Sequence, residues 1–163
     1  MINFINHTNE KFISDFFSNY EARLNSMCPL GMNFTVTAYC LDNIPSDMQE
    51  SVDFLGDFID NPCMCWPNPP ISIPLKDILL YNPQIRVAYN LTDEEMYGLL
   101  AHEVGHYIFE YSNPIPSQDK EQFCDDIAVR IGLGKELKNA LKKIIPICTP
   151  NLVSEVNNRI QRL

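Results

Sequence analysis

The chain has 163 residues, 45% of them hydrophobic, and carries a formal net charge of −9 at pH 7. A chain of this length buries a sizeable core as one unit, so we interpret residues 1–163 as a single domain. The acidic balance, without an evident basic patch, argues against nucleic acid as a partner, because phosphate binding requires clustered Lys and Arg.

Nothing in the sequence predicts a membrane segment or an export signal. No stretch approaches the roughly 20 apolar residues of a membrane span. Met1–Phe17 mixes apolar residues with Asn, Glu, Lys and Asp, and it lacks the basic start and apolar centre of a signal peptide. We therefore expect a cytoplasmic protein that does not bind membranes, and we expect its six cysteines to be reduced.

The first half of the chain predicts two helices and a strand. Glu10–Leu24 is amphipathic, with its aromatic side chains on one side, and predicts a helix. Apolar residues alternate with polar ones over Asn33–Cys40, which predicts a half-buried strand. Ser46 with Gln49 predicts the cap of a second helix that continues to about Ile59.

A Pro-rich run from Pro62 to Pro74 follows, and we expect it to be mostly irregular, because each Pro removes a backbone donor. A short edge strand is predicted within it at Ile71–Ile73. Leu75–Tyr81 is ambiguous between a helical turn and a strand, whereas Gln84–Tyr89 is interpreted as a strand. An extended substrate could pair with residues 84–89 or 71–75 through main-chain hydrogen bonds.

The next helix is predicted from Thr92 to just before Pro114. Thr92 and Glu95 form a capping-box pattern, and acidic residues follow the cap, where the helix dipole favours negative charge. Gly105 is unusual inside a helix, because Gly costs about 1 kcal/mol there relative to Ala. We interpret it as a place where another backbone or a metal site comes close.

The sequence HEVGH, residues 102–106, lies in the middle of this helix. Residues i and i+4 share a helix face, so His102 and His106 can close on one metal ion. Glu103 lies about 100° round the helix from His102, off the metal but within reach of a water bound to it. This arrangement suits metal-assisted hydrolysis, with zinc as Lewis acid and the carboxylate as proton acceptor.

A third protein ligand is expected from the following helix, predicted over Gln118–Gly132. An antiparallel helix pair can bring Glu121 over the two histidines, and Asp125 would then accept the free ring N–H of one of them. The competitors for third ligand are Glu110, Asp125 and Asp126. Glu110 lies roughly 6 Å further along the helix axis than His106, too far to share the ion easily.

At these residues the chain resembles a known family. HEVGH followed by EQFCD at 121–125 is similar to the HExxH plus ExxxD signature of gluzincin zinc metallopeptidases. The short spacing between the two halves is most similar to the ImmA/IrrE type of small bacterial and phage-associated peptidases. The run from Ile127 to Gly132 is equally similar to the HtpX-like branch. Cys124 stands where a small residue is usual, and Ile127 where the ImmA/IrrE pattern favours an aromatic one.

The resemblance covers residues 92–132 and carries implications for the fold and the site. It implies an α+β, zincin-like domain in which a small twisted sheet packs on the HExxH helix together with further helices. It implies a zinc ion held by His102, His106 and Glu121. It also implies Glu103 as the general base and Asp125 as a carboxylate that supports one of the ligands from behind.

These residues predict a zinc-dependent metallopeptidase that acts on a peptide or protein substrate. Metal-activated water would attack the scissile carbonyl, with Glu103 taking the proton of the water and passing it to the leaving amine. No spacing argument selects an oxyanion stabiliser among Tyr89, Tyr107 and Tyr111. The remaining helices, Gly134–Ile145 and one opened by Thr149 and Pro150 through Leu163, are interpreted as scaffold.

The alternative is a non-catalytic, zinc-binding regulatory or protein-interaction module on a zincin-like fold. A structural zinc site is closed by four protein ligands, so a fourth ligand from Cys63, Cys65 or Asp125 would favour it. Cys63 and Cys65 lie in the sequence Asn-Pro-Cys-Met-Cys-Trp-Pro. The simplest interpretation of this stretch is an irregular loop packed by Trp66. The functional interpretation is that one of the two thiolates covers the zinc, or that Trp66 lines a cleft.

Overall fold

The computed structural model describes residues 1–46, 48, 61–66, 77–112, 119–148 and 150–163. Within these ranges the chain forms an α+β fold of six α-helices and one four-stranded sheet. The helices are α1 (Lys11–Met27), α3 (Pro83–Ala88), α4 (Asp93–Tyr111), α5 (Lys120–Arg130), α6 (Gly134–Ile144) and α7 (Pro150–Arg162). Two short 3-10 turns are η1 (Leu41–Asn43) and η3 (Ile145–Ile147).

The sheet is open and mixed. Its strands are β1 (Ile2–Asn6), β2 (Phe34–Cys40), β3 (Cys63–Trp66) and β4 (Ile78–Tyr81), arranged in the order β1-β2-β4-β3. β1, β2 and β4 run parallel, whereas β3 pairs antiparallel with β4, with Cys65 opposite Leu79. β3 therefore forms the edge of the sheet that lies beside α4.

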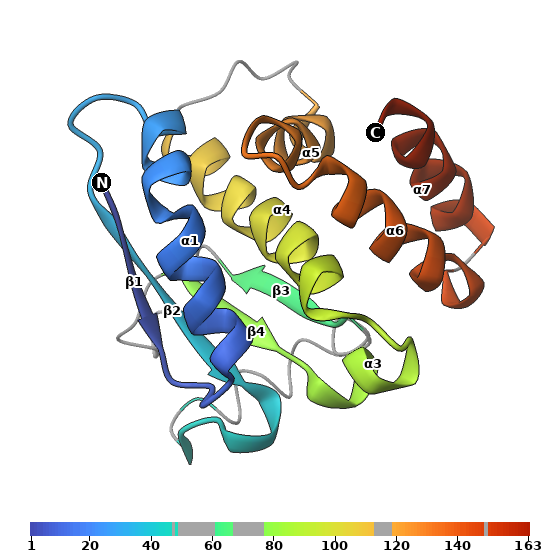
Figure 1. Ribbon diagram of the computed structural model, residues 1–163, viewed down its shortest axis with the longest axis horizontal. Helices are drawn as coiled ribbons and strands as arrows, with labels where there is room; N and C mark the ends of the chain where they lie inside the picture. The colour runs from blue at the N-terminus through green and yellow to red at the C-terminus, as the bar shows by residue number, and fades with distance from the viewer. Residues whose placement is uncertain (47, 49–60, 67–76, 113–118, 149) are drawn as a thin grey trace.

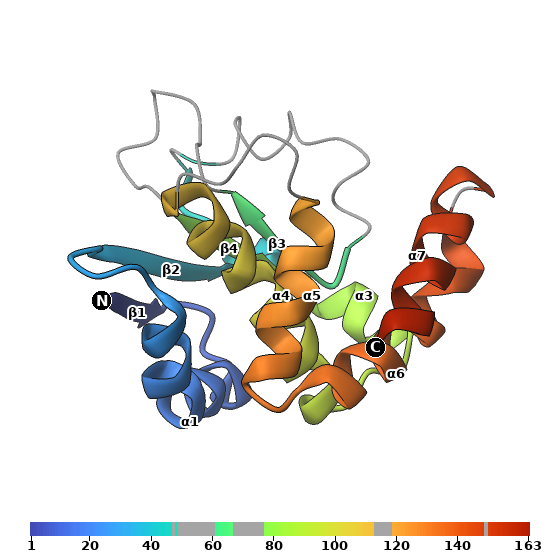
Figure 2. The same cartoon turned by 90° about the horizontal axis from the view of Figure 1, so that it is seen from above.

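The main core lies between the sheet and the helices. α1 and α4 lie across one face of the sheet (Figure 1) and share a buried apolar cluster with residues of all four strands. A smaller cluster, which includes Tyr39, Ile78 and Leu80, lies on the other face, as expected when successive strand residues alternate between faces. α5 and α6 pack against α4, and α7 packs on α6 at the end of the molecule farthest from β1 (Figures 1 and 2).

Two glycines let helices approach α4 closely. A Cβ added at Gly105 would lie 2.9 Å from the Cα of Cys124 on α5, and one at Gly98 would lie 2.3 Å from the backbone N of Leu137 on α6. The interpretation of Gly105 as a site of close backbone approach is therefore confirmed.

Most helices predicted from the sequence are present. The structure confirms the helices expected at 10–24, 92–113, 118–132, 134–145 and 149–163, and the strand at 33–40, with ends shifted by a few residues. The ambiguous segment Leu75–Tyr81 contains strand β4. The helix expected over Ser46–Ile59 and the strand at Ile71–Ile73 lie wholly or mostly outside the described residues.

Two predictions from the middle of the chain are wrong. Most of Gln84–Tyr89 belongs to helix α3 instead of a strand, and Tyr89 is the C-cap residue of that helix. The side chain of Asn82 caps this helix by accepting hydrogen bonds from the N–H groups of Gln84 and Ile85, and Pro83 occupies its first turn. Cys63–Trp66, expected as part of an irregular loop, forms strand β3 instead, because its backbone pairs with β4, whereas residues 67–74 of the Pro-rich run lie outside the described residues. β1 had no counterpart among the predicted elements.

None of the described helices combines the length and apolar character that a membrane crossing requires. All six cysteines lie in the described part and are free thiols, as expected; Cys63 and Cys124 are buried, and the other four are half-buried.

Candidate metal centre

The two histidines of HEVGH lie on the buried side of α4. The helix begins with the predicted capping box: Thr92 accepts from the N–H of Glu95, whose carboxylate accepts from the N–H of Thr92. Ten residues later, His102 is 4% exposed and His106 is 8% exposed. Their rings are perpendicular, with centroids 4.9 Å apart. One face of α4 thus presents both imidazoles to the neighbouring helix.

Helix α5 brings a carboxylate to both rings. Asp119 caps α5 by accepting from the N–H of Gln122, and this cap places Glu121 in the first turn of the helix. Glu121 Oε2 lies 3.3 Å from His102 Nε2, and Glu121 Oε1 lies 3.7 Å from His106 Nε2. The two Nε2 atoms therefore face the two oxygens of a single carboxylate.

The other ring nitrogens have partners on the same helix. His102 Nδ1 lies 2.9 Å from Asp125 Oδ1, and His106 Nδ1 lies 3.3 Å from the sulfur of Cys124. With Asp125 as an acceptor, His102 carries its proton on Nδ1, so Nε2 keeps a lone pair for a metal.

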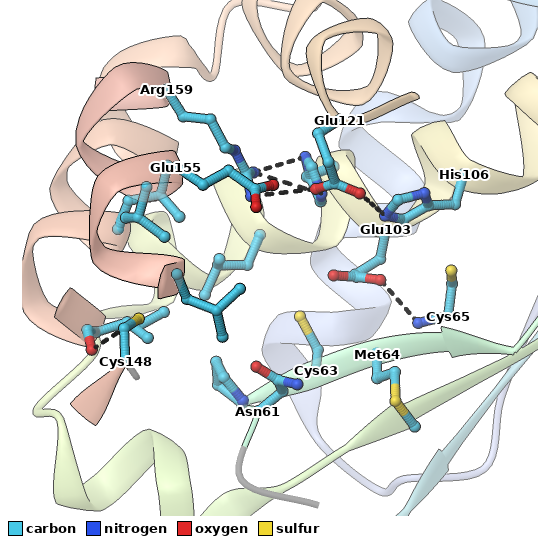
Figure 3. A pocket seen from close by; sticks show the side chains of 17 residues that line it. Asn61, Cys63, Met64, Cys65, Glu103, His106, Glu121, Cys148, Glu155 and Arg159 are labelled. Carbon is cyan, nitrogen blue, oxygen red and sulfur yellow. Dashed lines mark hydrogen bonds and ion pairs between the residues drawn. The ribbon is translucent and has the colours of Figure 1, made fainter. Parts of the chain in front are cut away.

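Glu103 is held from the opposite side by the edge of the sheet. The backbone N–H of Cys65 on β3 donates to Glu103 Oε2 at 2.7 Å, as Figure 3 shows. Ligand atoms of Glu103, His106 and Cys65 all lie within 4.8 Å of one another. The carboxylate of Glu103 is thus fixed beside the histidines, whereas that of Glu121 faces both of their Nε2 atoms.

Arg159 of α7 completes the cluster. Its guanidinium donates to both oxygens of Asp125, at 2.9 and 2.7 Å, and to Glu121 Oε2 at 3.1 Å. It also lies 3.1 Å from His102 Nδ1. Sequence reasoning missed this residue and assigned α7 to scaffold. No local signal marks it, because its partners lie 34 to 57 positions away in the chain.

A cavity of about 490 Å³ opens onto these groups. Figure 3 shows Glu121, Glu103, His106 and Arg159 on one side and the β3 residues Cys63, Met64 and Cys65 on the other. Apolar side chains of α4, α6 and α7 form the remaining wall, including Leu99, Leu141, Ile144, Leu152 and Val156. The site therefore combines a polar end with an apolar one.

The charges in the cluster shift one another's pKa values. The hydrogen bond with His102 lowers the pKa of Glu121 to about 2, despite its partial burial. Burial favours a higher pKa for Asp125, but its hydrogen bonds with His102 and Arg159 outweigh burial and lower it. Both carboxylates are therefore ionised at neutral pH.

The two histidines respond in opposite directions. Burial would lower the pKa of His102, but hydrogen bonds to Asp125 and Glu121 outweigh burial and raise it. Burial lowers the pKa of His106. Burial also raises the pKa of the Cys124 thiol, so in the metal-free protein this sulfur is protonated at neutral pH.

Of the three competitors for third ligand, Asp125 faces Nδ1 of His102, and the other two lie elsewhere. Glu110 forms an ion pair with Lys120 at 2.9 Å, and Asp126 is exposed on α5. Neither lines the cavity. The structure thus brings His102, Glu103, His106, Glu121 and Asp125 together, as the sequence predicted.

The tyrosines considered as oxyanion stabilisers do not line the cavity in the described part of the chain. The hydroxyl of Tyr107 donates to the carbonyl of Ile78, and that of Tyr111 donates to Asp77 at 2.7 Å. Both therefore tie α4 to the sheet.

Several of these side chains are arranged as a metal site. The buried residues His102, His106 and Cys124 have ligand atoms within 4.8 Å of one another, close enough to bind one ion. Cys124, however, contacts Nδ1 of His106, whereas the Nε2 atoms of both rings face Glu121. A histidine gives one nitrogen to one ion, so these contacts define two alternative third ligands.

Comparison of the chain with models of protein families, with curated proteins and with solved structures finds no match. The assignment of a function therefore depends on the residues and geometry of this site.

Proposed function

We propose that this protein is a zinc-dependent metallopeptidase, in which His102, His106 and Glu121 hold the metal on a zincin-like fold. The observation that carries the proposal is that both Nε2 atoms face the carboxylate of Glu121 at 3.3 and 3.7 Å. Two imidazoles and one carboxylate are a donor set that suits zinc, and three protein ligands leave a position open, as catalytic sites require. A bound zinc ion would supply Lewis-acid activation of water and of the scissile carbonyl.

The remaining groups have roles that follow from their positions. Glu103, which lies beside the histidines and accepts the hydrogen bond of Cys65 N–H, would accept the proton of the attacking water and deliver it to the leaving amine. Asp125 holds the ring of His102 in the tautomer that leaves Nε2 free. No metal-ligand role is then needed for Cys63 or Cys65.

β3 offers a place for an extended peptide. The carbonyl of Pro62 accepts from the N–H of Asn82, on the β4 side, whereas the N–H of Cys65 points away from β4 toward Glu103. Along a strand these directions alternate, so the main-chain groups of Cys63 and Cys65 line the outer edge of the described sheet, beside the cavity. A substrate strand added there would lie across the site. β3 thus takes the role that the sequence left open between residues 84–89, which lie in and beside helix α3, and residues 71–75, which lie outside the described residues.

The test combines metal analysis with a peptidase assay. We expect about one zinc per chain in the unmodified protein, lost or strongly weakened in Glu121→Ala. Glu103→Gln should retain the metal and lose turnover, because the amide cannot accept the proton. Turnover by Glu103→Gln at the rate of the unmodified protein would refute the proposed base, and an unmodified protein that binds no zinc would refute the site.

A second candidate function is favoured by the position of Cys124. If its thiolate, in place of Glu121, bound the ion with the two histidines, the donors would be of the Cys and His type that is usual in structural zinc centres, whose sites are closed. The protein would then be a non-catalytic regulatory or protein-interaction module. Cys124→Ala separates the two: zinc affinity close to that of the unmodified protein supports the open site, and a large loss supports the closed one.

A further inference from the structure

The side chain of Arg159 is unusual for an arginine because it is 8% exposed and reaches the centre of the polar cluster. An arginine is almost never this buried unless its charge is paired. Arg162, one turn further along α7, shows the contrast. Its side chain is 40% exposed, and its carboxylate partners, Asp119 and Asp125, lie 3.8 and 3.9 Å away.

Arg159 forms a bidentate ion pair with Asp125. Its Nε donates to Oδ2 at 2.9 Å and its terminal N–H group donates to Oδ1 at 2.7 Å. The same Oδ1 faces His102 Nδ1 at 2.9 Å. Parallel hydrogen bonds of this kind fix the orientation of a carboxylate as well as its position. The orientation of the His102 ring therefore depends on the guanidinium through Asp125.

The same side chain also contacts the proposed third ligand. Its other terminal nitrogen lies 3.1 Å from Glu121 Oε2, the oxygen that faces His102 Nε2 at 3.3 Å. Glu121 is 35% exposed at its side chain and borders the cavity, so the contact with Arg159 helps to fix its rotamer. One guanidinium thus touches one proposed ligand directly and holds a second one through its partner.

We propose that Arg159 is a positioning residue of the metal centre, fixing Glu121 directly and His102 through Asp125. The C-terminal helix α7 is then part of the site, since it supplies this side chain across α6. The inference rests on the proposed ligands His102, His106 and Glu121, but it concerns metal affinity and stands whether or not the protein cleaves peptides.

The experiment measures the zinc dissociation constant by competition with a chromogenic chelator. It compares the unmodified protein with Arg159→Met, Arg159→Lys and the control Arg162→Met. Circular dichroism of each zinc-free variant checks that it is folded. The visible absorption of the Co²⁺-loaded proteins reports the geometry of the ligands, which a general loss of stability does not change.

We expect Arg159→Met to weaken zinc binding by about 10- to 100-fold, as is typical when the partner of a ligand is removed, and to change the cobalt spectrum. Arg159→Lys should remain weakened, because an ammonium group cannot make the two parallel bonds to Asp125. Arg162→Met should bind zinc as the unmodified protein does.

Three results would overturn the inference: unchanged binding in Arg159→Met, tighter binding in Arg159→Met, or full recovery in Arg159→Lys, which would show that charge alone suffices. If Arg159→Met does not fold, the lysine variant and its cobalt spectrum decide. An unmodified protein that binds zinc but cleaves no peptide would refute the proposed enzyme and leave this inference intact. An unmodified protein that binds no zinc would overturn both.

Discussion

Gly105→Ala tests whether the close approach of α4 and α5 sets the geometry of the metal centre. The added Cβ would lie 2.9 Å from the Cα of Cys124. Carbon atoms in contact lie about 3.5–4.0 Å apart, so the helices must separate there by about 0.6–1.1 Å. Because the clash is with backbone, no rotamer change relieves it.

The expected effects on stability and on metal binding differ in size. Ala gains about 1 kcal/mol of helix propensity over Gly, while overpacking of this kind costs about 1–3 kcal/mol. The free energy of unfolding should therefore fall by about 0–2 kcal/mol. The contact between His102 Nδ1 and Asp125, now 2.9 Å, would lengthen to about 3.5 Å or more, beyond the range of a good hydrogen bond. Zinc affinity should then fall by about 10-fold or more.

The assay pairs chemical denaturation with chelator competition for zinc. The double variant Gly105→Ala with Cys124→Ala is a useful control, because shortening Cys124 leaves its Cα in place and should not rescue zinc binding. Zinc affinity in Gly105→Ala equal to that of the unmodified protein would refute the link between helix spacing and the site.

Three further predictions concern the surroundings of the site. Cys65→Pro removes the N–H that donates to Glu103, a hydrogen bond to a charged group that contributes about 1.5–3 kcal/mol. It should lower kcat by about 10- to 100-fold with zinc content unchanged. The control Cys65→Ala keeps the N–H and should retain kcat. Burial and the hydrogen bond to Asp77 raise the pKa of Tyr111 to about 12. Its neutral form is therefore favoured by folding, so this stabilisation is complete below about pH 10 and is lost as the pH rises toward 12; denaturation at pH 8 and 10.5 should show a smaller loss for Tyr111→Phe than for the unmodified protein. Thr92→Ala removes the cap of α4 and should cost about 1 kcal/mol in urea unfolding, with zinc affinity unchanged, because the cap lies at the far end of the helix from the second histidine.

The parts of the site that the sequence predicted have local signals. The capping box at Thr92 fixes where α4 begins, and the spacing of His102 and His106 then places both rings on one face. Glu121 and Asp125 are one turn apart on the next helix, so correct helix assignments sufficed to bring them over the histidines.

The parts that were missed depend on contacts between distant segments. β3 is a strand because its backbone pairs with β4, and four residues inside a Pro-rich run give no alternation that would predict it. Arg159 lies in an amphipathic helix, and the sequence pattern of such a helix predicts that a single arginine is exposed to solvent. Helix α3 is different: Asn82 followed by Pro83 is a cap signal present in the sequence, and the apolar residues after it led to the wrong assignment.

The charge of the cluster gives an independent reason for a divalent ion. Glu103, Glu121 and Asp125 are three carboxylates, and Arg159 is the buried guanidinium that pairs with two of them, whereas the exposed Arg162 lies 3.9 Å from Asp125. With neutral imidazoles, the three carboxylates and Arg159 carry a formal charge of −2. Burying uncompensated charge costs free energy, and a divalent cation at the Nε2 atoms would cancel it. Zinc should therefore stabilise the fold, by about 2.7 kcal/mol at a free concentration 100 times its dissociation constant. Identical denaturation midpoints with and without zinc would show that the folded cluster does not hold the ion.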